Sequence, residues 1–219
     1  MIEMRSRFDG QLEQLNNKMI EMGALCENIM ALSSKALIDG SPEIAHAARE
    51  KGPEIDRAER EIEAFCLKLL LQQQPVAKDL RIISAALKMI TDMERIGDQA
   101  EDIAEIIGHL NGRTGEECHG IRTMASSAIK MVTDSIDAYV KRDIELSRAV
   151  CAFDDTVDRE FNEIKATLIK MIAENPDDGE YALDILMIAK YFERIGDHAV
   201  NIAEWVEFSV TGVHKGEKI

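Results

Sequence analysis

One segment of this chain occurs twice, and this repetition limits the folds that the chain can adopt. Residues 94–107 read ERIGDQAEDIAEII and residues 193–206 read ERIGDHAVNIAEWV, so nine of the fourteen positions are identical. Farther upstream, residues 55–62 and 157–164 both carry an aliphatic-Asp pair that is followed by Glu-Ile. Because these landmarks follow the same order in both halves, the sequence indicates an internal duplication in which the halves share one architecture.

Helix-breaking residues divide the chain into long segments. Strong breaks fall at 39–42, 111–115 and 175–179, and weaker ones at 74–75 and 141–143. Aromatic residues make up only 5% of the chain and there are four prolines, so Leu, Ile, Met and Ala must fill the core, as in helical bundles. The expected helices are 3–38, 43–73, 75–109, 118–140, 144–174 and 180–208.

Short connections between long helices make sequential helices antiparallel neighbours. The predicted fold is therefore all-α, with two tandem antiparallel three-helix bundles at 1–112 and 116–219 that are related by internal duplication. Ser41 and Asp143 are the expected N-caps of the helices that follow them. Gly52-Pro53 should kink the second helix, since proline lacks the backbone donor.

The charge of the chain excludes several classes of partner. With 26 basic and 41 acidic residues the net charge is −15, which opposes binding to nucleic acid and to anionic lipid. No segment approaches the roughly 20 apolar residues that a membrane-spanning helix needs, so direct membrane insertion is not expected. The four cysteines form no Cys-x-x-Cys pair, and we interpret them as buried thiols of a cytoplasmic protein.

The repeated segment places acidic residues on one face of a helix. In steps of about 100° per residue, Ile96, Ala100 and Ile103 fall on the core face and the acids fall on the opposite, outward face. The first acidic ridge comprises Glu94, Asp98, Glu101, Asp102 and Glu105, and the second comprises Glu193, Asp197, Asn201 and Glu204.

A bound cation is one explanation for these ridges. Like charges one turn apart destabilise a helix, and a mid-helix glycine, here Gly97 and Gly196, costs about 1 kcal/mol relative to Ala. Carboxylates one turn apart can bridge metal ions, and oxygen ligands suit Mg²⁺, Mn²⁺ or Fe. The alternative is a solvated face that Arg95 and Arg194 partly neutralise. The candidate metal ligands, including acids from the middle helices, are Glu94, Asp98, Asp102, Glu193, Asp197, Asp56, Asp154 and Asp158.

No constellation for catalysis stands out in the sequence. Glu43-x-x-His46 has the spelling of a carboxylate di-iron motif, but such sites need inward-facing acids, and the repeated acids here face outward. No Gly-rich phosphate loop follows a strand, so neither nucleotide binding nor an organic cofactor is expected.

Taken together, the motifs resemble those of the PhoU family of phosphate-signalling regulators. The opening helix with Phe8-Asp9 and Met22-Gly23 is similar, as is the run QQQPVAKDLR at 72–81. The signature Glu/Asp-x-x-x-Asp occurs once in each half, at 94–98 and 193–197, and Thr211-Gly212 resembles the family's closing turn.

This resemblance implies a cytoplasmic, non-enzymatic adaptor that acts between a phosphate ABC transporter, through its ATPase subunit, and a sensor histidine kinase. Such proteins repress the phosphate-starvation response when phosphate is sufficient. Some members carry multinuclear Fe or Zn clusters on the acidic signatures and others carry none. A homodimer is expected from the frequency of dimers among oligomers.

Two departures distinguish the halves, and two other functions stay open. Asn201 stands where the first half has Asp102, and Gly52-Pro53 occupies the register of the second half's Asp154-Asp155. Two metal sites, if formed, should therefore differ in nuclearity or affinity.

The alternative functions are a metal-binding or metal-storage bundle without a signalling role, and a purely structural helical domain.

Overall fold

The computed structural model describes residues 2–72 and 76–218, with side chains for 8–71 and 76–217. Its elements are α1 Ile2–Asp39, α2 Pro42–Arg49, α3 Gly52–Gln72, α4 Ala77–Ile107, η1 Gly115–Glu117, α5 Ile121–Lys141, α6 Ile144–Glu174, η2 Pro176–Asp178, α7 Gly179–Thr211, β1 Val213–His214 and β2 Glu217–Lys218. The prediction of an all-α chain is confirmed. The one addition in the described residues is a short antiparallel hairpin after the last helix, in which β1 and β2 have two residues each.

The expected second helix, 43–73, is in fact two helices. The chain does not kink at Gly52-Pro53 but breaks into α2 and α3. The amide of Lys51 donates to the carbonyl oxygen of Ala48 at 2.9 Å, which closes a tight turn before α3 begins. The break therefore lies at the proline that cannot continue a helical hydrogen-bond ladder.

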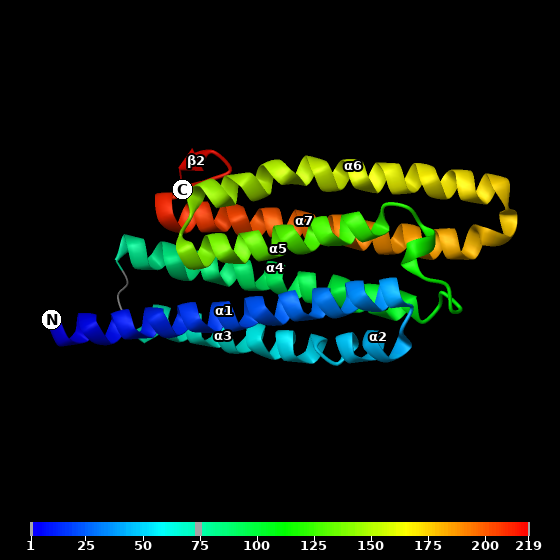
Figure 1. The fold of residues 1–219 in the computed structure, drawn as a ribbon. Coiled ribbons are helices and arrows are strands. Elements are labelled where there is room, and N and C mark those ends of the chain that lie inside the picture. Colours follow the sequence, from blue (N-terminus) through cyan, green and yellow to red (C-terminus); the bar gives the residue numbers. More distant parts are fainter. Residues whose placement is uncertain (1, 73–75, 219) are drawn as a thin grey trace.

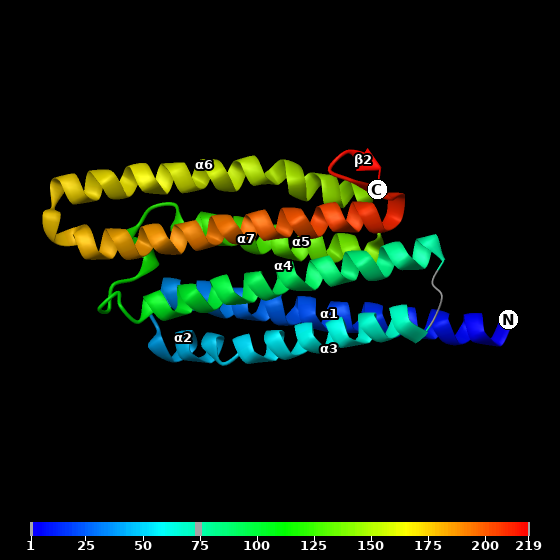
Figure 2. The ribbon, with the colours of Figure 1, turned by 180° about the vertical axis from the view of Figure 1, so that it is seen from behind.

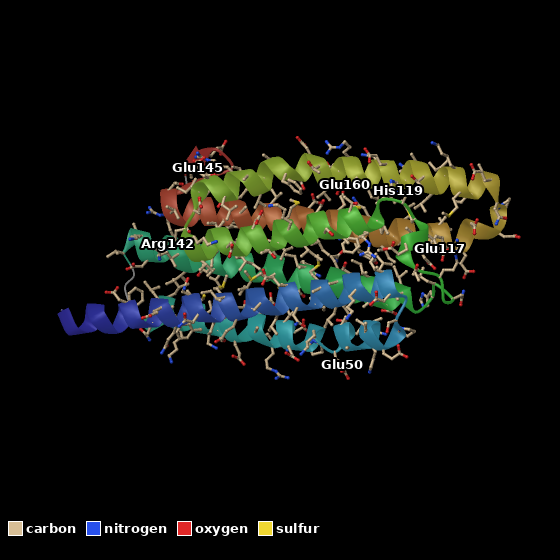
Figure 3. The ribbon with its side chains drawn as sticks, in the orientation of Figure 1. Glu50, Glu117, His119, Arg142, Glu145 and Glu160 are labelled. Atoms are coloured by element: carbon tan, nitrogen blue, oxygen red, sulfur yellow. The ribbon has the colours of Figure 1, made fainter. Side chains whose placement is uncertain are left out.

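The expected caps form at the other helix starts. The amide of Ile44 donates to Ser41 Oγ at 3.3 Å, and the amide of Leu146 donates to Asp143 Oδ1 at 3.0 Å. Arg142, labelled in Figure 3, ends α5 with a left-handed φ of 53°, so the chain reverses directly into α6. Gln74 and Pro75, where a helix restart was expected, lie outside the described residues.

All the long helices run along one axis (Figure 1), in two bundles of the predicted kind. In the first half α1 packs against α2, α3 and α4, and in the second half α5, α6 and α7 pack against one another. The halves meet where α4 lies antiparallel to α7, which is the most extensive contact between any two helices, and where α1 lies against α5 (Figures 1 and 2).

One hydrophobic cluster runs through both halves. It includes Met93 and Ile103 of α4 as well as Ile195 and Ile202 of α7, all with no exposed surface. The division into domains at 1–112 and 116–219 stays a prediction, because the buried side chains of the two halves form a single continuous core. None of the described helices combines the length and the apolar character that crossing a bilayer would require.

Candidate functional site

Three acidic side chains meet at the seam between α3 and α4. Asp56 of α3 and Glu94 and Asp98 of α4 each place a carboxylate oxygen within 4.8 Å of the others. Among the described residues this is the one group of three or more such side chains that approach so closely. We call these three residues the first acidic group.

A glycine on α4 brings these helices together. A Cβ at Gly97 would lie 2.8 Å from Cδ1 and 3.3 Å from Cγ2 of Ile55, which precedes Asp56 on α3. Ile55 is itself buried, with 1% of its surface exposed. The absence of a side chain at Gly97 therefore lets α3 approach α4 until Asp56 reaches the two carboxylates of α4.

The carboxylates of the first acidic group are partly buried and repel one another. Partial burial raises the pKa of Glu94 most, and the neighbouring charge of Asp98 raises it further, while Arg95 opposes the shift. Arg95 lies across both carboxylates, with Nε 3.4 Å from Glu94 Oε2 and an Nη atom 3.0 Å from Asp98 Oδ2. Partial burial likewise raises the pKa of Glu59 and of Glu101, and Asp56 adds to both shifts. A cation could relieve this excess of negative charge.

A second acidic group lies at the equivalent seam between α6 and α7. It comprises Asp154 and Asp158 of α6 with Glu193 and Asp197 of α7. Burial, followed by the charges of Asp197 and Asp158, raises the pKa of Asp154 to about 6. Glu193 forms an ion pair with Lys190, so part of the negative charge at this seam is already neutralised.

The two seams differ in how tightly the helices pack. A Cβ at Gly196 would lie 3.4 Å from the sulfur of Met131 and 3.5 Å from Asp154 Oδ1, which are ordinary contacts. A methyl group at position 196 would thus make only ordinary contacts, whereas one at position 97 would press on the side chain of Ile55, which would have to shift. This difference accompanies the looser arrangement of the second acidic group.

Asp102, another predicted ligand, faces a different neighbour. Partial burial raises the pKa of Asp102 and the nearby Tyr191 hydroxyl opposes the shift, so Asp102 lies on the side of α4 that packs against α7. At the same interface Asn201 Nδ2 donates to Asp92 Oδ1 at 3.1 Å, and His198 Nδ1 lies 2.9 Å from the same oxygen. Asp102 therefore does not point toward Asp56, and Asn201 contributes to the contact between the two halves.

The ridges are also less exposed than the helical wheel predicts. The side chains of Glu94 and Glu193 keep only 20% and 15% of their surface exposed. The acids were expected on the outward face opposite the core, and none of them is buried: Glu105 and Asp197 are exposed, while Glu94 and Glu193 are partly covered. Glu94 lies along the seam with α3 and Glu193 along the seam with α6, so these two helices cover one flank of the ridges.

Three acidic residues that the sequence does not single out as ligands or contacts lie at these seams. Glu59 lies near Asp56 and Glu94, and Asp92 receives the hydrogen bonds of α7. Glu101 belongs to the first ridge but was not among the expected ligands. Partial burial raises its pKa, and the charges of Asp98 and Asp56 both raise it further, so it lies near the first acidic group. The spacing of Asp56, Glu59 and Glu63 on one face of α3 was the available signal.

The donor set of the first acidic group fits a hard cation. Asp56, Glu94 and Asp98 offer carboxylate oxygens alone, which suit Mg²⁺, Mn²⁺ or iron better than a thiolate-preferring metal. The Glu43-x-x-His46 motif is not part of this group. Glu43 accepts a hydrogen bond from Ser41 Oγ at 2.9 Å, and His46 lies 3.6 Å from Glu50.

Comparison with known proteins identifies the family. The PhoU domain profile matches twice, over residues 19–107 and 121–206. A phosphate-specific transport system accessory protein PhoU homolog of Pseudomonas aeruginosa is 36% identical over 94% of this chain and 86% of its own length. The protein of the same name from Clostridium acetobutylicum is 35% identical over 95% of this chain and 96% of its own length.

Solved structures agree with this assignment. The crystal structure of PhoU from Pseudomonas aeruginosa superimposes with a TM-score of 0.89 at 36% identity, covering 94% of this chain and all of that one. The phosphate transport system regulatory protein PhoU from Streptococcus pneumoniae shares the fold, with a TM-score of 0.87 at 23% identity over 97% of this chain and 99% of that one. With both halves matched by the domain profile and relatives above 30% identity, the chain belongs to the PhoU family.

Proposed function

We propose that this protein is a cytoplasmic accessory regulator of phosphate uptake and of phosphate-starvation signalling. The observation that carries the proposal is the match of both halves to the PhoU domain, together with relatives named as accessory proteins of a phosphate-specific transport system. A metal-storage bundle is not favoured, because the names of these relatives refer to transport.

The mechanism in this proposal is contact rather than catalysis. The protein would be a non-enzymatic adaptor between the ATPase subunit of a phosphate ABC transporter and a sensor histidine kinase. Long helices with charged outer faces support such a role, because they offer extended surfaces that a partner helix can pack against. We also propose a homodimer, which light scattering of the purified protein tests.

Metal binding is a further part of the proposal. The first acidic group would hold Mg²⁺, Mn²⁺ or a multinuclear Fe or Zn cluster, and the second acidic group would hold a weaker site. The support is the convergence of Asp56, Glu94 and Asp98 within 4.8 Å and the raised pKa of Glu94. When bound, the metal would neutralise the carboxylates and hold α3 against α4.

Elemental analysis tests the metal proposal. The purified protein should contain metal, and the Asp56→Asn/Asp98→Asn variant should lose the larger part of it. Glu105→Gln is the matched control, because Glu105 lies on the same ridge but pairs with Arg49 at 3.9 Å. Equal metal content in all three proteins would contradict the proposal.

Deletion of the gene tests the regulatory role. Loss of the protein should make phosphate-starvation genes constitutively active in phosphate-replete medium, and the wild-type gene should restore repression. Normal repression in the deletion strain would refute the role in signalling.

A further inference from the structure

The end of the α6–α7 pair carries exposed apolar side chains. Both helices extend past the neighbouring ends of α4 and α5 (Figures 1 and 2). Ile169 of α6 is 59% exposed, and Leu183 and Met187 of α7 are 60% and 46% exposed. In a chain with a net charge of −15, three large exposed apolar side chains near one end of the α6–α7 pair are a candidate contact surface.

The helix register places these residues together. Arg148 of α6 lies 2.8 Å from Glu207 of α7, and Lys190 of α7 lies 5.5 Å from the ring centroid of Phe161 on α6. Because the helices are antiparallel, these contacts bring Ile169 to the level of residues 182–186. Ile172 and Leu186, on the same helices, are partly buried and pack against the core. We define the apolar patch as the exposed Ile169, Leu183 and Met187.

The seam next to the apolar patch becomes acidic. Beyond Phe161 and Lys190 it continues into the second acidic group, in which Asp158 and Asp197 are exposed. From Leu183 to Asp197 the distance along α7 is about 21 Å at 1.5 Å per residue. One face of the molecule therefore offers apolar contacts at one end and negative charge at the other, over the length of about four helical turns.

The first half shows that the fold does not require an apolar residue at two of these positions. At the repeat offset, Ser84 and Lys88 of α4 correspond to Leu183 and Met187 of α7. Lys88 is exposed in its bundle, as Met187 is in the second. The apolar side chains of Leu183 and Met187 are thus a property of the second half, and polar residues are compatible with the same helix position.

We propose that this face of α6 and α7 is the docking site for an amphipathic helix of a partner protein. That helix would carry apolar side chains at one end, to cover the apolar patch, and Lys or Arg at the other end, to pair with Asp158 and Asp197 when no metal ion occupies the second acidic group. Charge complementarity favours this occupant, because Asp158 and Asp197 are exposed at the end of the face away from the apolar patch. Lys190, which lies between them and the patch, is paired with Glu193. The inference rests on the proposed function, since it names the surface that an adaptor would present.

A peptide of matching chemistry tests the docking site directly. The probe is a fluorescent helix-forming peptide of about 14 residues with Leu and Ile on one face of its first half and Lys and Arg on that face of its second half. Its binding to the full chain is followed by anisotropy in the presence of a chelator, which keeps metal off the carboxylates. Wild type should bind it, and high salt should weaken the binding.

Variants locate the binding on the surface. Leu183→Ser/Met187→Lys, which copies the first half, should weaken binding about tenfold or more, equivalent to at least 1.4 kcal/mol. Asp158→Asn/Asp197→Asn should weaken binding at low salt and flatten its salt dependence. Leu71→Ser, at an apolar residue that is 87% exposed at the other end of the molecule, is the control and should bind as wild type does.

Other outcomes would overturn the proposal. These are no binding of the peptide at low salt, equal binding by the patch variant, or equal binding of a peptide with scrambled sequence. A wild-type dimer that the patch variant converts to monomer would assign the patch to a second copy of the chain, and patch-dependent binding to anionic vesicles would assign it to lipid.

A complementation assay separates this inference from the proposed function. In the deletion strain, Leu183→Ser/Met187→Lys should fail to restore repression while Leu71→Ser restores it, at equal protein levels. Full complementation by the patch variant overturns the docking site and leaves the regulatory role intact. A deletion strain with normal repression instead overturns the regulatory role, whatever the peptide binds.

Discussion

At the scale of single residues, the glycines of the repeated motif occupy unequal surroundings. Gly97 lies against the buried Ile55, whereas Gly196 has room for a methyl group at ordinary contact distances. Both positions are mid-helix, where Ala is favoured over Gly by about 1 kcal/mol. The glycine of the repeated motif therefore has a packing role in the first half only.

Alanine at these two positions should act in opposite directions. Gly196→Ala should raise the free energy of unfolding by up to about 1 kcal/mol through helix propensity. Gly97→Ala should lower it by about 1 kcal/mol, because overpacking against Ile55 costs about 1–3 kcal/mol and outweighs the same gain. Urea unfolding of both variants measures the difference, and equal effects would show that α3 does not approach α4 closely.

The pKa of Asp154 predicts a pH dependence of stability. Its pKa is raised from 3.8 to about 6 in the folded protein, so the folded state holds this proton more tightly than the unfolded chain does. The stabilisation from the protonated carboxyl is complete below pH 4 and is lost as the pH rises through about 6.

Asp154→Asn should remove the loss of stability that the ionised Asp154 carboxylate causes at higher pH. In chelator, the melting temperature of the variant should exceed that of wild type above pH 6, with the gap closing below pH 4. Asp155→Asn, at the next and more exposed position, is the control. A gap that is independent of pH would contradict the prediction.

At the scale of elements, α4 and α7 meet through two polar contacts that the repeat relates to each other. Asp92 corresponds to Tyr191 and Asp102 to Asn201 at the offset of 99 residues. In one contact Asn201 donates to Asp92, and in the other the Tyr191 hydroxyl lies near Asp102. Each contact contains one carboxylate, that of Asp92 or that of Asp102. An acid at position 201 would put a second carboxylate beside Asp92, which explains why the second ridge has Asn201 where the first has Asp102.

Asn201→Asp should therefore destabilise the protein. It would place a second carboxylate near Asp92 in a partly buried interface and remove the donor, at a cost of about 1–3 kcal/mol. The exchanged pair Asp92→Asn/Asn201→Asp should recover part of the loss, because it restores one amide and one carboxylate. A double-mutant cycle by chemical denaturation measures the coupling, and additive effects would contradict it.

At the scale of the whole molecule, the two bundles share one core. Buried side chains of α4 and α7 belong to the same cluster as those of the outer helices, so separation of the halves would expose apolar surface of both. The repeats are thus coupled in folding even though each has a complete set of helices.

The full chain should accordingly unfold in one cooperative transition. Calorimetry should give equal calorimetric and van't Hoff enthalpies, since neither half keeps its core when the other unfolds. Two separated transitions, each assignable to one half by hydrogen exchange, would show that the bundles are independent.

The sequence by itself determined the helical architecture, because the repeat, the breaking residues and the apolar periodicity are local signals. It also located the acidic residues on the right helices, including Asp56 beside Glu94. Only the tertiary structure decided which neighbour each acid faces. A helical wheel gives a direction about one helix axis, but not the position of the next helix. The burial of Glu94 against α3 and the contacts of Asp102 and Asn201 across the α4–α7 interface depend on how separate helices pack.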